Sequence, residues 1–509
     1  MKLKRLLAFM LAVMLFASAC STGTGTGTND TDNSAESTAD ETETAAEQET
    51  EPADPAKTLD LPDTDWGGRE YRVLGYACIY SQFETFEISS EGENGEVVND
   101  AIYRRNTGIE DKYNVKITEY KDDSNTGDWS GANYPYFQRT TLAGEDLYDL
   151  AFLSIAQIGT AAREHYLQDL NQVEYIDFSK DWWNQNVNDT FTLYDQLYFT
   201  SSDFSLRDKN RTYILAFNKD MVNNYALEDP FALVKEGKWT LDVMTAWAEK
   251  VSQDTDGNGK VDYTDTFGIG CDSYNAFTAF VYGGDVSTMG KDDTGALTLT
   301  LNNEHTVNVL DKVFESFGSK SLTVVCDDWS GKSGDLNMWA VASTAFYEGR
   351  ALLATAFPAD LSDLSEKCEH DYGIIPFPKY DEAQEQYCTY ADYMGMLFGI
   401  PITCGDPSFA GFMIEALSAA STDTTLQAYY EVSCKTKYTY DEESAGMLDL
   451  IFSNIKYDLA KIYGITGASD FIYTIGIRRK NTFASRYASV ESKALVDIEA
   501  LIADFTEQE

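Results

Sequence analysis

The sequence predicts an α/β fold with two lobes, and three of its features support this expectation. Strand-like apolar segments alternate with amphipathic helices in the first third of the chain, as in a largely parallel sheet. About 450 residues follow an N-terminal leader, which is too much chain for one core and enough for two. The last third is mainly helical, so helices are expected to cover the sheets.

The first part of the folded chain is expected to alternate between strands and helices. Residues 69–77 (REYRVLGYA) predict a buried strand, residues 96–113 an amphipathic helix, and residues 114–120 an alternating second strand. Residues 146–154 end in a further buried strand. Ligands of such sheets bind beyond the carboxyl ends of the strands, so we expect Tyr76 beside a ligand site.

The middle of the chain shows a different pattern. Residues 196–206 and 212–222 predict a pair of strands. Residues 238–251 predict a helix because large apolar side chains recur every four positions. Thr240 is placed to cap its first turn, and Asp242 suits the positive end of its dipole.

The remaining elements follow from short apolar runs and from helical spacing. Residues 347–361, 372–382 and 394–402 each predict a strand that enters a turn. Residues 444–455 and 489–505 have the apolar spacing of helices. No internal repeat of fixed period is present, which argues against a solenoid or a propeller.

The N-terminus has the features of an export signal. Residues 1–19 combine a basic start with a short apolar run, and small residues precede Cys20, as in a bacterial lipobox. We expect cleavage before Cys20 and lipidation of its thiol; an ordinary signal peptide cut near Ala19 is the alternative. Residues 20–56 lack aromatic and basic residues, which predicts a disordered acidic tether rather than an acidic binding tail.

Composition narrows the possible partners. The formal net charge of -46 repels phosphate backbones, so no nucleic-acid partner is expected. Seven cysteines follow Cys20 without a C-x-x-C pair, and this predicts small buried side chains, although one pair could form a disulfide. Aromatic residues make up 13% of the chain, which suits both a large core and stacking on sugar rings.

Residues 254–265 (DTDGNGKVDYTD) carry the spacing of a loop that binds a hard cation through oxygen atoms. Gly259 permits the sharp turn that such a loop needs. Residues 266–270 predict a strand after the loop, so it shares the ligand spacing of an EF-hand without its second helix. The expected ligands are the side chains of Asp254, Asp256, Asn258, Asp262 and Asp265 and the backbone carbonyl of Lys260.

Calcium is the expected ion because all ligands are oxygen atoms and calcium is abundant outside cells. Asp265 is shorter than the glutamate usual at the last position, which could shift the preference towards Mg²⁺. The alternative is an acidic turn without metal. Because the loop joins a helix to a strand and nothing places it in a ligand cleft, we expect a structural ion.

Several segments together resemble the extracellular solute-binding proteins of bacterial ABC importers, in the carbohydrate-binding, maltose-binding-protein-like branch. The resemblance extends over residues 66–505, and its specificity lies in the order of the motifs rather than in any one of them. The motifs are YDL (148–150), LQDLN (167–171), AFNKDMV (216–222), DPFALVKEGKWTLDVM (229–244), DTDGNGKVD (254–262), FYEGRALLAT (346–355) and YGIIPFPKYDEAQ (372–384), together with the lipobox at Cys20.

The resemblance implies a type II periplasmic-binding-protein-like fold with a hinge and a ligand cleft between the lobes. Residues 66–203 and 365–417 would form the first lobe, and residues 204–364 and 418–509 the second. The implied protein is a monomer, anchored by lipid to the outer face of the cell membrane. It would deliver an oligosaccharide or another small solute to the transmembrane subunits of an ABC permease.

Sugar recognition needs aromatic faces and planar polar groups. The maltose-binding relative has a tryptophan near Ala359 of this chain, so we expect stacking from Trp329 or Tyr393 instead. Each candidate also has a purely structural alternative, as a turn residue, a cap or a packing residue. The expected ligand-binding residues are Tyr76, Asp203, Arg207, Trp329, Asp360 and Tyr393.

Two other functions compete with solute binding. A secreted carbohydrate-active enzyme would need two carboxylates across a cleft. A surface adhesin or sensor partner would use the same fold without a permease. No serine-hydrolase, metalloprotease or phosphate-loop motif is present, and the resemblance favours a binding protein over an enzyme.

Overall fold

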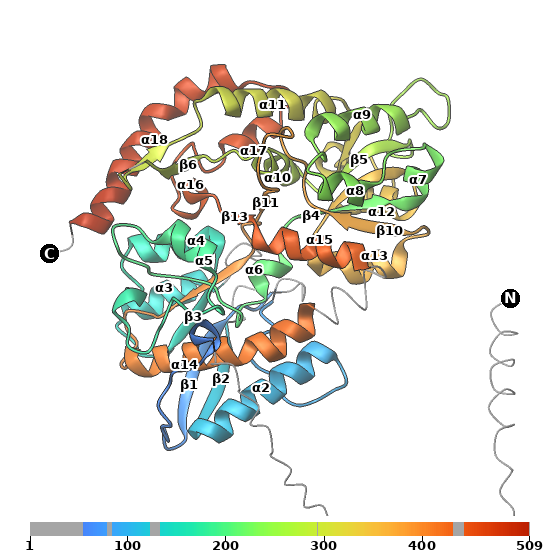
Figure 1. Cartoon of the computed structure of the whole chain (residues 1–509). Coiled ribbons are helices and arrows are strands. Elements are labelled where there is room, and N and C mark those ends of the chain that lie inside the picture. Colours follow the sequence, from blue (N-terminus) through green and yellow to red (C-terminus); the bar gives the residue numbers. More distant parts are fainter. Residues whose placement is uncertain (1–53, 79–83, 123–132, 293, 431–441, 508–509) are drawn as a thin grey trace, which may run out of the picture. The chain divides into compact units, whose positions relative to one another are not determined.

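The fold is built around two mixed β-sheets (Figure 1). The computed structural model describes residues 54–78, 84–122, 133–292, 294–430 and 442–507. The expected signal peptide (residues 1–19), Cys20 and most of the expected tether lie outside the described residues. Residues 54–56, expected at the end of the tether, take part in a short 3-10 helix (η1, Pro55–Lys57).

The first sheet has the strand order β12-β3-β1-β2. Strand β1 (Arg69–Gly75) pairs in parallel with β2 (Val115–Lys121) and β3 (Leu150–Ser154), and β12 (Met396–Gly399) runs antiparallel beside β3. Helix α2 (Val97–Tyr113) connects β1 to β2. This order confirms the alternation of strand, helix and strand expected for the first part of the chain.

Helices cover both faces of the first sheet. Leu74 and Leu153 point to one face and pack in one apolar cluster with Phe137, whereas Val73 and Phe152 belong to a cluster on the other face. Figure 1 shows α2 and α14 beside β1 and β2. The helices around this sheet, besides α2, are α3 (Tyr134–Leu142), α4 (Ile155–Arg163), α5 (Gln185–Phe191) and α14 (Pro407–Ser421).

The second sheet has the order β10-β4-β9-β5-β8. Its strands β5, β8 and β9 are parallel, and β4 is antiparallel to both of its neighbours. The bounds are β4 (Ile214–Asn218), β5 (Phe267–Cys271), β8 (Thr323–Val325), β9 (Ala351–Ala356) and β10 (Tyr372–Ile375).

Helix α9 (Leu241–Val251) confirms the helix expected at residues 238–251. The side chain of Thr240 accepts a hydrogen bond from the Val243 backbone N–H at 3.5 Å, as expected for a cap. Trp247 lies in the core beside Trp239, with ring centroids 5.1 Å apart. The helix therefore packs its apolar face on the second sheet and leads directly into the loop of residues 254–265.

Residues 196–206 and 212–222 do not form the expected strand pair. The first segment has no strand; Thr200 makes an isolated bridge to Phe398, and serines fix the rest through side-chain bonds. The second segment forms β4, which pairs with β9 and β10, followed by helix α7 (Lys219–Asn224). Long-range pairing therefore overrode the local alternation of side chains.

Residues 365–417, expected in the first lobe, contribute a strand to each sheet. Strand β10 pairs with β4 of the second sheet, and β12 pairs with β3 of the first. Between them, β11 (Thr389–Tyr390) pairs with β13 (Ile455–Lys456) in a two-stranded sheet. The chain thus passes between the two large sheets along residues 376–395.

The remaining elements surround the second sheet and the C-terminus. Among the described residues, no helix combines the length and the apolar composition needed to cross a membrane. These elements are η3 (Leu170–Gln172), α6 (Arg207–Asn210), α8 (Pro230–Lys235), α10 (Asn275–Gly283), β6 (Met289–Lys291), β7 (Leu297–Leu299), α11 (Glu304–Phe317), η4 (Cys326–Trp329), η5 (Met338–Ala340), α12 (Val341–Tyr347), η6 (Pro358–Asp360), α13 (Leu361–Lys367), η7 (Thr422–Leu426), α15 (Glu442–Ser453), α16 (Leu459–Ile462), α17 (Phe471–Gly476) and α18 (Phe483–Thr506).

The cysteines of the described residues are free thiols, and most of them are buried as expected for small apolar side chains. Cys368 is only half-buried, and Cys434 lies outside the described residues. Trp183 is buried and donates its Nε1–H to Glu415 Oε2 at 3.1 Å. The tryptophans at 182, 183 and 239 therefore anchor the cores.

Candidate functional site

Most residues of the candidate ligand site lie at the carboxyl ends of the parallel strands in both sheets. In the first sheet, Tyr76 follows β1, and β12 starts opposite the end of β3, so the segment before Met396 lies at the same edge. In the second sheet, Asp272 follows β5 and Phe357 follows β9. Because β4 starts opposite the end of β9, Tyr213 lies at that edge too.

Two short segments join these edges. Thr212 forms a β-bridge with Ala391, and the backbone N–H of Asp392 donates to the carbonyl of Arg211 at 3.0 Å. The side chains of Arg211 and Asp392 are both buried and form an ion pair at 3.7 Å. The start of β4 and the segment before β12 therefore meet at one polar site between the sheets.

Arg211 also lies on an aromatic surface. Its guanidinium carbon is 3.7 Å from the ring centroid of Phe357, and the Phe357 and Tyr213 rings have centroids 4.3 Å apart. A guanidinium held by a ring face and a carboxylate keeps its plane fixed. This geometry suits a donor that must recognise hydroxyl groups in a defined direction.

Two further charged residues, Arg207 and Glu87, lie close together at the edge of the first sheet. The backbone N–H of Arg207 donates to Glu87 Oε1 at 3.1 Å, and both residues are buried. Burial raises the pKa of Glu87, and the charge of Arg207 opposes this shift. Burial lowers the pKa of Arg207 to about 10, helped by the charge of Arg211 and opposed by Glu87 and Tyr76.

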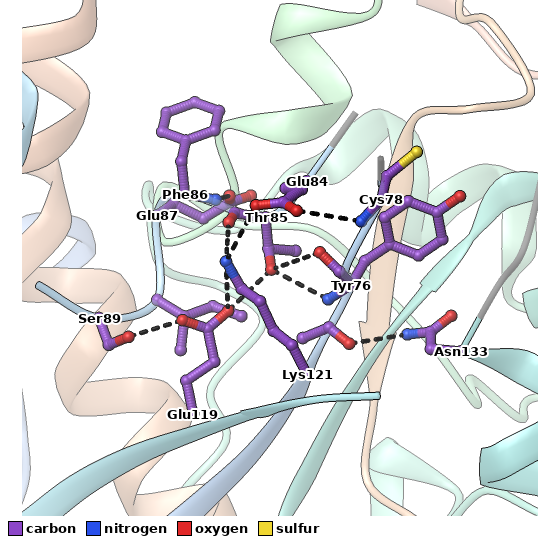
Figure 2. A network of polar contacts seen from close by, with 12 residues as sticks. Tyr76, Cys78, Glu84, Thr85, Phe86, Glu87, Ser89, Glu119, Lys121 and Asn133 are labelled. Atoms are coloured by element: carbon purple, nitrogen blue, oxygen red, sulfur yellow. Dashed lines mark hydrogen bonds and ion pairs between the residues drawn. The ribbon is translucent and has the colours of Figure 1, made fainter. Parts of the chain in front are cut away.

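Figure 2 shows the polar network that holds this edge. Thr85 Oγ1 donates to Glu119 Oε1 at 2.8 Å and accepts from the Tyr76 backbone N–H at 3.0 Å. Lys121 Nζ donates to the carbonyl of Thr85 at 2.6 Å and forms an ion pair with Glu119 at 3.6 Å. These bonds fix the backbone of Tyr76 at the end of β1, beside the buried Glu87.

Asp272 is a half-buried carboxylate on the second sheet. It accepts hydrogen bonds from Thr355 Oγ1 at 2.8 Å and from the Tyr213 hydroxyl at 3.3 Å. Burial raises its pKa to about 7, and the negative charges of Asp392 and Asp360 add to the shift. Asp272 is therefore a carboxyl group whose charge the site itself does not fully stabilise.

Asp360 and Tyr393 complete the site. Asp360 is half-buried and accepts the Phe357 backbone N–H at 2.9 Å; burial raises its pKa, and the charge of Arg211 opposes this shift. Tyr393 directly follows Asp392, is also half-buried, and lies 5.6 Å from Lys461 Nζ, measured to the ring centroid. We call the following set the inter-sheet site: Tyr76, Glu87, Arg207, Arg211, Tyr213, Asp272, Phe357, Asp360, Asp392 and Tyr393.

The inter-sheet site combines the groups that bind hydroxyl-rich ligands. Carboxylates accept hydrogen bonds from hydroxyls, guanidinium groups donate to them, and a partly exposed aromatic ring such as that of Tyr393 stacks on C–H faces. None of these groups forms a nucleophile–base pair of the kind that activates serine or cysteine. The arrangement therefore suits recognition.

The structure brings four of the six expected ligand residues together: Tyr76, Arg207, Asp360 and Tyr393. Asp203 accepts a hydrogen bond from Thr422 Oγ1 at 2.7 Å. Trp329 packs edge-on against Tyr263 with ring centroids 5.6 Å apart, beside the loop of residues 254–265. These contacts are a side-chain hydrogen bond and a ring packing, and the role of either residue in ligand binding stays a prediction.

Sequence reasoning missed Glu87, Arg211, Asp272 and Asp392. The chain has 84 acidic residues, so no single carboxylate was informative. A usable signal was present, because Asp272 directly follows β5 as Tyr76 directly follows β1. Arg211 lies at the carboxyl edge of the sheet only because β4 runs antiparallel to β9. The sequence of β4 does not indicate that direction.

The loop of residues 254–265, here called the cation loop, places three carboxylates together. Oxygen atoms of Asp254, Asp256 and Asp265 all lie within 4.8 Å of one another. Gly257 and Gly259 have φ angles of 70° and 75°, and their backbone N–H groups donate to Asp254 at 2.8 and 2.7 Å. The loop thus has the sharp turn that Gly259 predicted.

The other expected ligands have partners within the loop. Asn258 Oδ1 accepts the Lys260 backbone N–H at 2.7 Å, and Asp262 Oδ1 accepts the Thr264 backbone N–H at 2.9 Å. Hydrogen bonds from Thr264 lower the pKa of Asp262, which favours its charged form. Three carboxylates converge in the loop, and all the ligand atoms that it offers are oxygen atoms. This set fits a hard divalent cation.

Comparisons with known proteins were made for the whole chain. A scan against known protein families finds no match. A search of curated proteins also finds none. The fold, in contrast, is shared with many solved structures.

A cyclo/maltodextrin-binding protein complexed with maltotetraose has a TM-score of 0.55, with 13% identity over 86% of this chain and 97% of that chain. UgpB of Mycobacterium tuberculosis in complex with glycerophosphocholine has a TM-score of 0.54, with 15% identity over 86% and 99%. An ABC substrate-binding protein of Listeria monocytogenes in complex with cycloalternan has a TM-score of 0.50, with 14% identity over 87% and 100%. The chain therefore has the type II periplasmic-binding-protein-like fold.

Proposed function

We propose that this chain is an extracytoplasmic solute-binding protein that captures an oligosaccharide in the inter-sheet site and delivers it to an ABC permease. The observation that carries the proposal is the meeting of two strand edges at Arg211 and Asp392, with further carboxylates and the partly exposed ring of Tyr393 around them. In open α/β sheets, ligands bind beyond the carboxyl ends of the strands. The fold is one on which sugar-binding proteins are built.

The proposal includes a lipid anchor at Cys20, which rests on the lipobox-like sequence before it. The acidic residues between Cys20 and the folded part would hold the inter-sheet site away from an anionic membrane surface. Capture outside the cell and import through a permease would then follow from lobe closure around the solute.

A thermal-shift screen of residues 54–509 against neutral, amino and acidic oligosaccharides tests the binding role. A ligand at 100 times its dissociation constant stabilises by about 2.7 kcal/mol, which is measurable as a rise in Tm. We expect hits within one glycan class. A flat response to the entire panel would contradict the proposal.

One observation favours the alternative of a carbohydrate-active enzyme. The pKa of Asp272 is raised to about 7, which is the range that a general acid of a glycoside hydrolase needs. Chromatography of each hit after incubation with the protein separates the two functions. Unchanged glycan supports the solute-binding role, and shortened glycan supports hydrolysis.

We also propose that the cation loop holds a structural Ca²⁺. Asp254, Asp256 and Asp265 would supply carboxylate oxygens, and the ion would neutralise charges that now lie within 4.8 Å. Asp265 is buried two residues before β5, and Arg350 donates to the carbonyl of Asp265 at 3.3 Å. The ion would therefore stabilise the connection between α9 and β5 of the second sheet.

A further inference from the structure

The charges of the inter-sheet site do not balance. Arg211 pairs with Asp392 at 3.7 Å, and the charge of Arg207 acts on Glu87, which also accepts the Arg207 backbone N–H. The site thus holds two guanidinium groups and four carboxylates, so two carboxylates are left over. They belong to Asp272 and Asp360, for which no ion pair within 4.0 Å occurs in the described part of the chain.

The lysines around the site have carboxylates of their own. Lys209 lies 3.6 Å from Asp208, and Lys461 forms an ion pair with Asp470 at 2.5 Å. Lys121, at the edge of the first sheet, pairs with Glu119. These lysines therefore do not offset the excess negative charge.

The donors that reach the two leftover carboxylates are neutral. Asp272 accepts from the hydroxyls of Thr355 and Tyr213, and Asp360 accepts from a backbone N–H. Both carboxylates are half-buried, so water hydrates them incompletely, and burial raises the pKa of each. A carboxylate in this position gains most from a cation that arrives with a ligand.

A half-buried aromatic ring stands near Asp272. The charges of Asp392 and Asp272 both act on Tyr393, whereas the Tyr213 ring, whose hydroxyl is bonded to Asp272, is buried. Ring faces attract cations as well as sugar C–H groups. Carboxylates with adjacent rings are the combination that recognises a protonated amine.

We propose that the ligand of the inter-sheet site carries a protonated amine that contacts Asp272 and Asp360, as an amino sugar or an amino-substituted oligosaccharide would. This inference rests on the proposed function, because it assigns a ligand class to the same site. It predicts that acidic sugars, such as uronates, are rejected by the excess negative charge.

The test uses matched oligosaccharides that differ only in charge. Thermal shift and calorimetry at pH 7 would compare cello- and malto-oligosaccharides with their 2-amino-2-deoxy and uronate counterparts. We expect the amino member of at least one series to bind tenfold or more tightly than its neutral counterpart. A neutral or acidic member that binds equally well or better would overturn the inference and leave the proposed function standing, whereas no binding in any series would overturn both.

Two variants distinguish a specific contact from a general charge effect. Asp272→Asn should reduce the preference for the amino member at least tenfold. Asp111→Asn makes the same charge change on the exposed surface of α2 and should leave the preference unchanged. An equal loss in both variants would show that only net charge matters, and it would overturn the assigned contact.

Discussion

Replacing Asp272 with asparagine should stabilise the ligand-free protein at neutral and alkaline pH. The side-chain amide of the variant would keep an oxygen for Thr355 and Tyr213 but would carry no charge. The site raises the pKa of Asp272 from its ordinary value of 3.8 to about 7, chiefly by burial. Each tenfold change in proton affinity corresponds to about 1.4 kcal/mol, so the ionised side chain costs at most about 4 kcal/mol above pH 7.

The sign of the pH dependence follows from the raised pKa. Between about pH 4 and pH 7 the folded protein binds a proton at Asp272 that the unfolded chain has lost, so its stability falls as the pH rises. The advantage of Asp272→Asn should grow over this range and stay constant above it. Denaturant unfolding of both proteins at pH 4, 5.5, 7 and 8.5 measures this difference.

Asp111→Asn is the matched control, because it removes a carboxylate from an exposed helix surface. Its unfolding free energy should follow that of the original protein at each pH. The reasoning is refuted if Asp272→Asn is the less stable protein at pH 8.5, or if its advantage does not change with pH.

The remaining predictions concern the cation loop, the guanidinium of the site, the packing of the second sheet and the anchor. Chelation should lower Tm without changing ligand affinity. If calcium stood at 100 times its dissociation constant, its removal would lower the unfolding free energy by about 2.7 kcal/mol, and an unchanged Tm would contradict a structural ion. Arg211→Lys keeps the charge but loses the plane stacked on Phe357, so calorimetry should show at least a tenfold loss of affinity, and unaltered affinity would remove the residue from the site. Gly268→Ala puts a Cβ 2.3 Å from α9 and should destabilise by about 1–3 kcal/mol, whereas Gly92→Ala meets nothing within 4 Å and should unfold like the original protein. Cys20→Ala should move the protein from the membrane fraction to the soluble fraction on immunoblots, and retention in the membrane would argue against lipidation.

The sequence was most informative where a local signal determines the structure. Helix α9 was predictable because its capping threonine and its apolar spacing act within a few residues. Strands β1 and β3 were predictable because buried parallel strands are short and apolar, and β2 because its side chains alternate between apolar and polar. The same signals led to Tyr76 and Asp360, because each follows a predicted strand.

The sequence was misleading where distant segments decide the outcome. Residues 196–206 alternate like a strand, but buried serines there bond to Asp208 and to Ser418 on α14 instead of joining a sheet. Arg211 and Asp392 meet only because β4 and β12 both run antiparallel to their neighbours. No pattern within either segment contains that information.

The composition of the chain also limited what could be inferred about the site. Trp329 was a reasonable candidate for sugar stacking, yet it packs on Tyr263 in a small apolar cluster. The other stacking candidate, Tyr393, lies in the inter-sheet site and follows a buried carboxylate that no motif marks. Both rings are half-buried, so their places in the fold separate the two candidates, and those places depend on the whole fold.

The central claim is that solute binds between the carboxyl edges of the two sheets. A crystal structure of residues 54–509 with the tightest glycan from the screen tests this claim most directly. The prediction is a glycan in contact with Arg211, Asp272 and Tyr393. A glycan bound elsewhere, for example on the exposed Trp339, would contradict the assignment of the site.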